Sequence, residues 1–165
     1  MELRQWTHKD KISLMNLCNE VDRTYLRGTM PFPYLEEDAD WWLTTVEEHD
    51  GKDRIVRAII VDGKVAGSIS VEQMADVRSK DAEIGYMLDT DYWGQGVMTD
   101  AVREICEIAF REMDIIRITG MVYEPNVASA KVLEKNGFVL EGVLKNAVVK
   151  DENIYNLRIY GKVKP

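Results

Sequence analysis

Residues that could cross-link the chain or hold a metal are scarce in this sequence. It has two cysteines, Cys18 and Cys106, which lie far apart and form no CxxC motif. A disulfide framework is therefore not expected, and this cysteine usage fits a reducing compartment. There are also only two histidines, His8 and His49, in unrelated polar settings. With so few histidines we expect no metal site and no Ser-His-Asp triad.

Long apolar runs are missing as well. None approaches the roughly 18 residues that a helix needs to span a bilayer. The first residues, MELRQWTHKDK, are polar and charged, unlike a signal peptide. We therefore expect a cytoplasmic protein with no membrane contact.

Basic residues are outnumbered by acidic ones. Lys and Arg total 21, Asp and Glu total 29, and the formal net charge is −8. Binding to a nucleic-acid backbone rests largely on basic contacts, so a nucleic-acid partner is not expected. The same balance disfavours an anionic membrane surface. It mildly favours cationic ligands such as amines, although an acidic surface also serves solubility alone.

The remaining composition is that of a globular protein. Hydrophobic residues make up 45% of the chain and charged residues 30%, which argues against disorder. A length of 165 residues suits one domain covering residues 1–165. At that size a chain buries roughly 70% of the surface that its unfolded form exposes, so it needs no metal or disulfide to be stable.

Strand and helix periods alternate along the chain. The expected strands are Glu2–Trp6, Arg54–Asp62, Lys64–Met74, Ala82–Leu88, Ile115–Tyr123, Phe138–Lys150 and Asn153–Val163. The expected helices are Lys9–Glu20, Glu36–His49, Gln95–Met113 and Asn126–Asn136. An Asp62-Gly63 turn should join the second and third strands, and Gly137 should end the last helix. This order predicts an α/β (α+β) fold, a mixed sheet with helices on its faces.

A glycine-containing segment, Gly94-Gln95-Gly96-Val97-Met98-Thr99, lies where a strand gives way to the longest helix. The glycines allow a tight turn and a close approach to a ligand. The first N–H groups of a helix have no partner within it, and the helix dipole adds partial positive charge there. The segment therefore predicts an anion site suited to a pyrophosphate. The alternative is a glycine turn that binds nothing.

Two nucleotide-binding motifs are excluded. The sequence contains no GxxxxGK followed by Ser or Thr, so it has no P-loop. A Rossmann fingerprint needs a third glycine three residues after Gly96, and Thr99 stands there instead.

A second segment pairs an amide with a hydroxyl. Asn126 and Ser129 lie three residues apart, on one face of the last expected helix. They follow directly on the strand that ends at Tyr123, so the amide and the hydroxyl should lie together just past the end of that strand. The alternative is that Asn126 caps the helix and Ser129 is an incidental small residue.

In combination, AEIGYML, DYWGQGVMTDAV and NVASAKVLEKNGFVLEG resemble the GNAT superfamily of acyl-CoA-dependent N-acyltransferases, in particular the RimJ/RimL-type branch. The resemblance covers nearly the whole chain. It implies a mixed, mostly antiparallel sheet of about seven strands that splays centrally, with helices on both faces. The family loop usually reads Arg/Gln-x-x-Gly-x-Gly/Ala. Here Trp93 holds its first position and Met98 its sixth, so a side-chain contact to phosphate is in doubt while the backbone donors stay available.

The resemblance also implies acetyl-CoA as cosubstrate, with no metal. Its pyrophosphate would lie on the backbone of the glycine-containing segment, and its pantetheine arm would enter between the strands that end at Leu88 and Tyr123. An oxyanion would take a backbone N–H near Met87. The implied cofactor-binding residues are Met87, Leu88, Gly94, Gln95, Gly96, Val97, Met98, Thr99, Asn126 and Ser129.

For catalysis, the resemblance implies direct attack of an amine on the thioester. A carboxylate would assist as general base. Glu83 is the first candidate, because it lies on the strand beside the cofactor, and Asp81 and Glu124 are weaker alternatives. Many family members place a Tyr where this chain has Leu133, so Ser129 would donate a hydrogen bond to the leaving sulfur.

For the acceptor, the residues proposed to bind it are Tyr34, Trp41 and Glu83. Core packing is the alternative for the two aromatic residues. The favoured acceptor is a peptide or protein N-terminal α-amine. The alternatives are a small amine such as a polyamine or an aminoglycoside, or a non-catalytic module that only binds acyl-CoA. A homodimer is a further expectation.

Overall fold

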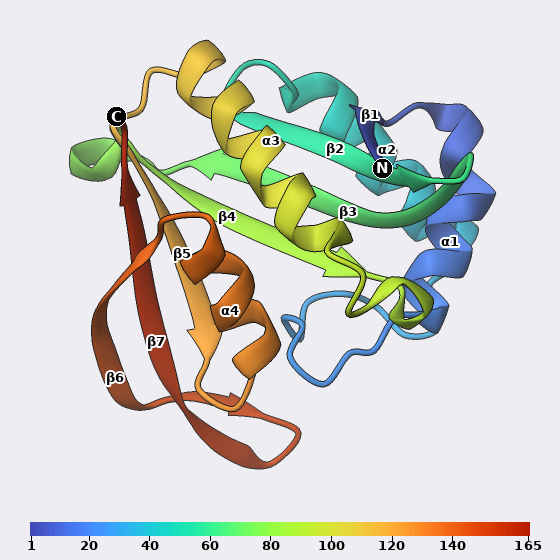
Figure 1. Ribbon diagram of the computed structural model, residues 1–165. Coiled ribbons are helices and arrows are strands. Elements are labelled where there is room, and N and C mark those ends of the chain that lie inside the picture. The colour runs from blue at the N-terminus through green and yellow to red at the C-terminus, as the bar shows by residue number, and fades with distance from the viewer.

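The computed structural model describes residues 1–165. Its centre is one seven-stranded sheet in the order β1-β2-β3-β4-β5-β7-β6 (Figure 1), and neighbouring strands are antiparallel except for β4 and β5. This confirms the expected mixed, mostly antiparallel sheet. The strands are β1 (Glu2–Gln5), β2 (Arg54–Val61), β3 (Lys64–Gln73), β4 (Asp81–Leu88), β5 (Arg117–Tyr123), β6 (Val139–Lys150) and β7 (Asn153–Val163).

Four α-helices cover the two faces of this sheet. Figure 1 shows α3 and α4 in front of the sheet and α1 and α2 behind it. Their bounds are α1 (Lys11–Glu20), α2 (Glu36–His49), α3 (Val97–Glu112) and α4 (Val127–Lys135). Three short 3-10 turns, η1 (His8–Asp10), η2 (Asp76–Arg78) and η3 (Thr90–Tyr92), were not expected from the sequence.

The two layers of helices enclose two separate cores, because successive side chains of a strand point to opposite faces. In β2, Ile55 and Ile59 pack under α3, whereas Val56 and Ala58 pack under α1 and α2. Helix α3 contributes the longest apolar stripe, in which Ile105 is completely buried. Both faces of the sheet are therefore dry near its centre.

The local signals in the sequence produce the turns that were expected from them. Asp62 and Gly63 both have positive φ angles, 49° and 76°, and join β2 to β3 directly. Gly137 has φ 78° and ends α4 in the left-handed conformation. A residue with positive φ costs little when it is glycine, which explains the choice at position 137.

The sheet is incomplete in its middle. Strands β4 and β5 pair over four residues only, Asp81–Ile84 with 117–120. Beyond this point β4 continues to Leu88 paired with β3, and β5 continues to Tyr123 paired with β7. The two strands thus separate, as expected, and leave a wedge-shaped gap that opens toward their carboxyl ends.

Helix α4 lies directly on β5 beside this gap. A Cβ atom added to Gly120 would stand 2.7 Å from Leu133 Cδ1, closer than carbon atoms normally approach. Leu133 itself is 1% exposed. The absence of a side chain at Gly120 therefore sets how closely α4 approaches the sheet.

The loop between α1 and α2, residues 21–35, connects the two halves of the molecule. Its Tyr25 ring packs edge-on against Tyr123 of β5 and Tyr155 of β7, with centroids 6.3 and 6.2 Å away. Lys150 of β6 donates to two carbonyl groups of the same loop. The loop thus lies against the C-terminal strands, although it begins and ends among the N-terminal helices.

Candidate functional site

The segment before α3 presents a row of free hydrogen-bond donors. Gly94 and Gly96 have φ angles of 71° and 80°, and no atom lies within 4 Å of a Cβ added to either. None of the six backbone N–H groups from Gly94 to Thr99 donates to an acceptor within the protein. Six consecutive donors at a helix N-terminus, where the dipole is positive, form a site for an anion.

Side chains that surround this segment hold it in place rather than extend into the site. The Trp93 indole Nε1 donates to the Leu88 carbonyl at 2.9 Å. Gln95 Nε2 donates to the Asp91 carbonyl at 2.8 Å. Both side chains are therefore occupied by contacts within the loop, and the donors left for a ligand are those of the backbone.

The backbone of β4 determines which groups point into the gap. The Asp89 N–H donates to the Ala66 carbonyl at 2.8 Å, so odd-numbered residues at this end of the strand bond to β3. Met87 follows this alternation, so its own N–H faces β3 and the donors near Met87 that face the gap belong to its neighbours. The N–H groups of Tyr86 and Leu88 point toward β5 instead, into the gap.

Ser129 lies on the far side of this gap and is bonded across it. Its Oγ is 2.8 Å from the Tyr86 Oη, and the same Oη donates to the Ser129 carbonyl at 3.3 Å. Burial raises the pKa of Tyr86 to about 12, so its hydroxyl is protonated at neutral pH. The sequence analysis did not identify Tyr86 as a site residue. The two-residue period of its strand, read together with Ser129, could have placed it on the α4 side.

Asn126 begins α4. Its Oδ1 accepts the backbone N–H of Ser129 at 3.2 Å, so the amide caps the helix. This cap fixes the first turn of α4 and with it the position of the Ser129 side chain. Asn126 thus caps the helix through Oδ1, as the alternative reading of the sequence expected. Its Nδ2 atom makes no hydrogen bond within the protein and is available to a ligand.

Glu83 lies on the opposite face of β4 from Tyr86, five residues before Leu88, where the pairing with β3 ends. Its carboxylate is ion-paired with the Arg27 guanidinium, which comes from the loop between α1 and α2. The Glu83 side chain is 17% exposed and that of Arg27 is 73% exposed. Glu83 is therefore sheltered on the side where the loop crosses, and Arg27 is its ion-pair partner.

The two alternative carboxylates already have close partners. Asp81 is buried, accepts from Thr119 Oγ1 at 2.8 Å and is ion-paired with Arg78 at 2.7 Å. Glu124 accepts from Asn156 Nδ2 at 2.6 Å. Of the three candidates, Glu83 is the one whose single partner is an exposed side chain.

The aromatic residues expected to bind the acceptor lie elsewhere. Tyr34 is 5% exposed and belongs to the core between α1, α2 and the sheet, in agreement with the alternative of core packing rather than with acceptor binding. Trp41 is 69% exposed on α2, a helix that packs against α1 and β2 rather than beside the gap. Tyr25, Tyr123 and Tyr155 are the aromatic residues that the fold brings to the end of β5.

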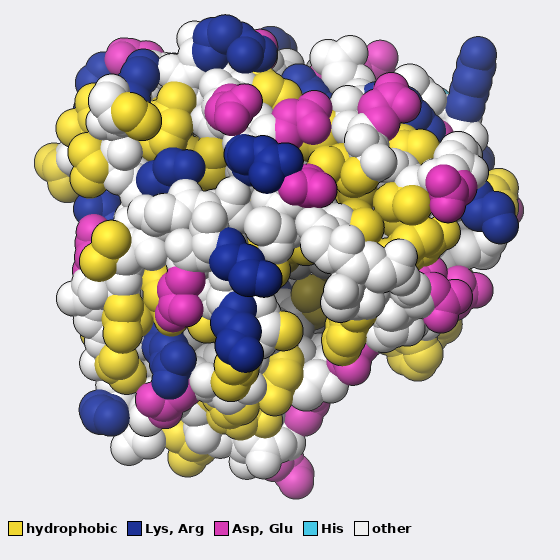
Figure 2. All heavy atoms as spheres, viewed as in Figure 1, with side chains coloured by type: hydrophobic (Ala, Val, Ile, Leu, Met, Phe, Trp, Pro, Cys, Tyr) yellow, Lys and Arg dark blue, Asp and Glu magenta, His cyan; other side chains and the backbone are white.

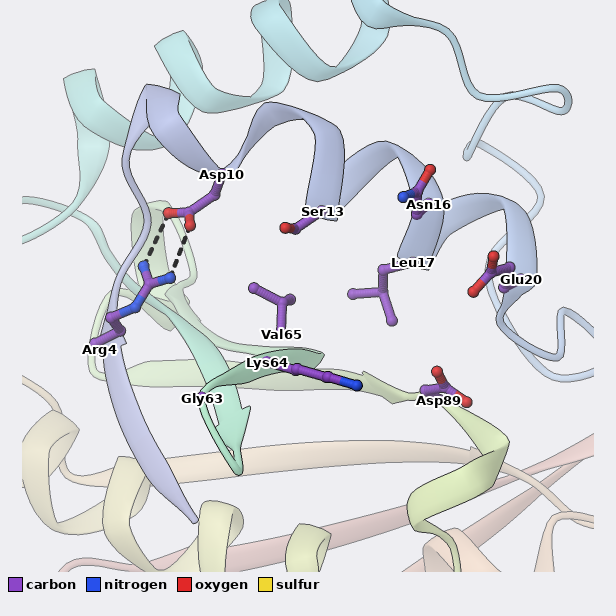
Figure 3. A pocket seen from close by; sticks show the side chains of 10 residues that line it. All are labelled: Arg4, Asp10, Ser13, Asn16, Leu17, Glu20, Gly63, Lys64, Val65 and Asp89. Atoms are coloured by element: carbon purple, nitrogen blue, oxygen red, sulfur yellow. Dashed lines mark hydrogen bonds and ion pairs between the residues drawn. The ribbon is translucent and has the colours of Figure 1, made fainter.

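The surface is hollowed next to α4, at the opening between β4 and β5, with hydrophobic atoms inside (Figure 2). A separate cavity of ≈ 390 Å³ lies between α1 and the β2–β3 turn. Figure 3 shows Arg4 and Asp10 facing one another at one end of that cavity and Asp89 at the other. The cavity contains none of the expected site residues.

The sequence of this chain matches a known protein family. The model of the acetyltransferase (GNAT) domain matches residues 1–139. The chain belongs to this family. Its match to the probable N-acetyltransferase YjcK of Bacillus subtilis has 39% identity over 87 residues and covers 53% of this chain and 48% of that relative. The chain thus aligns with about half the length of this relative.

A longer alignment joins the chain to the ribosomal-protein-serine acetyltransferase of Escherichia coli, with 25% identity over 146 residues, 86% of this chain and 81% of the relative. This supports the expected likeness to the RimJ/RimL-type branch of GNAT proteins.

Solved structures confirm the GNAT fold. RimL, a ribosomal-protein alpha-N-acetyltransferase in complex with coenzyme A, matches with a TM-score of 0.84 at 24% identity, over 98% of this chain and 92% of RimL. The microcin self-immunity acetyltransferase MccE, in complex with acetyl-CoA and AMP, gives a TM-score of 0.83 at 24% identity, over 98% and 91% of the two chains. The fold that surrounds the gap is therefore the GNAT fold throughout.

Two further features of the structure bear on the class of site. No helix is long and apolar enough to cross a membrane. No three side chains among His, Cys, Asp and Glu are grouped so that they could hold a metal ion.

Proposed function

We propose that this protein transfers an acetyl group from acetyl-CoA to a primary amine, and that its acceptor is the N-terminal α-amine of a peptide or protein. One observation carries the proposal. Six unpartnered backbone N–H groups, from Gly94 to Thr99, lie at the N-terminus of α3, next to a sheet that is open between β4 and β5. A diphosphate joined to an extended, amide-containing arm fits these two features at once.

The residues of the gap would hold the cosubstrate as follows. Gly94, Gln95, Gly96, Val97, Met98 and Thr99 would bind the pyrophosphate through their N–H groups. The backbone of Tyr86 and Leu88 would pair with the pantetheine arm, and Asn126 Nδ2 would add a donor. Acetyl-CoA supplies the activated acetyl group when bound. Helix α4 adds exposed basic residues, Lys131 and Lys135, and Figure 2 shows Lys and Arg side chains over this helix beside the hollow.

Glu83 would serve as the general base. An α-amine with a pKa near 8 is about one-tenth neutral at pH 7, whereas a lysine amine near 10.4 is less than about one-thousandth neutral. Glu83 first pairs with the incoming ammonium in place of Arg27, then takes a proton from it directly or through a water. The small neutral fraction of a lysine amine favours an α-amine as acceptor.

Ser129 would act on the other side of the reacting carbonyl. Its hydroxyl lies at the gap and donates a hydrogen bond to the sulfur as negative charge builds there. Leu133 carries no donor, and Ser129 is the one hydroxyl residue of α4. Replacing Ser129 by Ala should lower turnover roughly ten- to a hundredfold with little change in CoA affinity.

The relatives support an amine acceptor but differ in its size. One is a ribosomal-protein-serine acetyltransferase, and another is the L-amino acid N-acetyltransferase AaaT of Escherichia coli, 27% identical over 124 residues. A small amine is therefore the second candidate acceptor. The acidic surface, with a net charge of −8, suits either cationic acceptor. The proposal places the reaction in the cytoplasm, with a homodimer as its proposed assembly.

Two experiments test the proposal in sequence. Calorimetric titration should show CoA binding, and failure to bind at millimolar CoA would end the acetyltransferase assignment. Thiol release should then be screened with peptides, free amino acids, polyamines and aminoglycosides. Release with peptides supports the α-amine acceptor, and release with small amines alone supports the second candidate. Binding without release for any amine would make the protein a module that binds acyl-CoA.

Glu83→Gln tests the base. It should lower turnover at neutral pH by about a hundredfold, in line with the loss of a general base. Glu72→Gln is the matched control, because Glu72 is paired directly opposite Glu83 on β3, one strand farther from the gap. An equal loss in both variants would point to the charge of this face rather than to proton transfer.

A further inference from the structure

We propose that Tyr86 is a positioning residue that orients the Ser129 hydroxyl toward the sulfur of bound CoA. The inference rests on the proposed function, because it concerns the thiol end of the same site. It adds to the reaction a residue from β4, whereas the sequence suggested a donor from α4 only.

The geometry that supports this role spans the gap. Tyr86 extends from β4, and its Oη lies 2.8 Å from the Ser129 Oγ on α4. No other side chain lies within hydrogen-bonding distance of the Ser129 hydroxyl. The Ser129 backbone is fixed separately, because its N–H is bound by the Asn126 cap at 3.2 Å. The backbone of Ser129 is thus set by the cap, and its hydroxyl is set by Tyr86.

Each of the two hydroxyls carries one proton. Burial keeps Tyr86 protonated, with a pKa of about 12, and its proton has two acceptors on Ser129, the carbonyl at 3.3 Å and Oγ at 2.8 Å. Either oxygen can donate in the shorter contact, and in the proposed arrangement Tyr86 is its donor. The Ser129 proton is then free to point away from Tyr86, toward the gap. The sulfur would thus receive a hydrogen bond from a serine that is itself hydrogen-bonded, an arrangement in which each bond strengthens the next.

The step balances without proton transfer from either hydroxyl. Glu83 first passes the proton of the ammonium to solvent. The neutral amine then forms the new bond to carbon and loses a second proton to Glu83, while the C–S bond breaks and its electron pair goes to sulfur. A thiol has a pKa near 8.5, and a serine hydroxyl is a much weaker acid. Ser129 therefore keeps its proton and stabilises the thiolate by a charge-assisted hydrogen bond.

The chain offers a matched control. Tyr160 of β7 is also buried, and its Oη donates to Glu134 of α4 at 3.0 Å. Both tyrosines thus tie α4 to the sheet through one hydroxyl, but only Tyr86 reaches Ser129. Tyr86→Phe and Tyr160→Phe each remove one such tie, so any difference between them reports on Ser129.

The decisive measurement is the pKa of the thiol of enzyme-bound CoA, followed by the ultraviolet absorbance of the thiolate with desulfo-CoA as the blank. The wild-type value should lie below the free value near 8.5. Tyr86→Phe and Ser129→Ala should each raise it by about one unit, as expected for one lost hydrogen bond to a charged group. Ser129→Thr, which retains the hydroxyl, and Tyr160→Phe should leave it unchanged.

Turnover supplies the second readout. Tyr86→Phe should lower it about tenfold with unchanged CoA affinity, and should cause no further loss in the Ser129→Ala background. If Ser129→Ala raises the thiol pKa and Tyr86→Phe does not, the role of Tyr86 is overturned while the proposed function stands. Equal effects of Tyr86→Phe and Tyr160→Phe would also overturn it, in favour of a role in docking α4. Absence of CoA binding would overturn both proposals.

Discussion

The side-chain amide of Asn136 donates to the Thr99 carbonyl at 3.1 Å. The same Nδ2 atom donates to the Val132 carbonyl at 2.9 Å. Asn136 thus joins the end of α4 to the first turn of α3, where the N–H groups of the anion site lie. The two helices that border the gap are fixed to one another at this point.

Asn136→Ala tests this connection. We expect a loss of about 1 kcal/mol in stability, the net worth of a hydrogen bond, and a severalfold weaker affinity for CoA because the first turn of α3 is less well held. Calorimetric titration and thermal unfolding measure the two effects. Asn16→Ala, on the exposed side of α1, is the control. Unchanged CoA affinity would show that α3 is held without this contact.

Gly120→Ala tests the close packing of α4 against β5. The added Cβ would stand 2.7 Å from Leu133 Cδ1, so we expect α4 to shift and stability to fall by about 1–3 kcal/mol. Leu133→Ala alone should cost about 2–5 kcal/mol through its cavity. The double variant should lose less than the sum of the two, because the new methyl group enters the space that Leu133 vacates. Denaturant unfolding measures all three, and additive losses would contradict this packing.

Arg27→Gln tests the ion pair at Glu83. Because Arg27 is 73% exposed, we expect less than about 1 kcal/mol change in stability. Removal of the competing cation should lower the KM for the amine several-fold, with turnover at saturation unchanged. Steady-state kinetics with varied amine provides the measurement. A higher KM would mean that Arg27 helps to bind the acceptor instead of competing with it.

Asp10→Asn tests the ion pair at the start of α1. The hydrogen bond from Arg4, 2.7 Å from the carboxylate, lowers the pKa of Asp10 below its ordinary value of 3.8, against the opposing effect of burial. Stability from this pair is therefore fully present above pH 3.8 and is lost as pH falls through the lower, folded-state pKa. Thermal unfolding from pH 6 down to 2 should show a smaller acid loss in Asp10→Asn than in the wild type. Parallel curves would mean that Asp10 contributes none of it.

The local part of the site could be predicted from the sequence, because it depends on backbone conformation. Gly94 and Gly96 predicted a turn with exposed donors, and the turn has that form. The resemblance to the GNAT family also predicted the separation of β4 from β5. Asn126 and Ser129 could be placed on one helix face, since three residues in a helix make nearly one turn.

What the sequence did not reveal depends on register and on long-range contacts. A shift of one residue exchanges the groups that face β3 with those that face the gap, so the sequence placed the oxyanion donor near Met87 without distinguishing Met87 from Tyr86 and Leu88. Acceptor binding and core packing both stayed open for Tyr34, because an aromatic residue in a loop gives no sign of how deeply it is buried. Arg27 lies 56 positions from Glu83, and nothing local to either residue predicts their contact.

Only four residue pairs between β4 and β5 connect the two parts of the sheet. An extended molecule lodged between the two strands would form the backbone bonds that they do not make with each other. The cosubstrate would then be a structural part of the protein as well as a reactant, and would couple the two half-sheets. Amide hydrogen exchange along 85–88 and 121–123 should slow together when CoA binds, and the melting transition should sharpen.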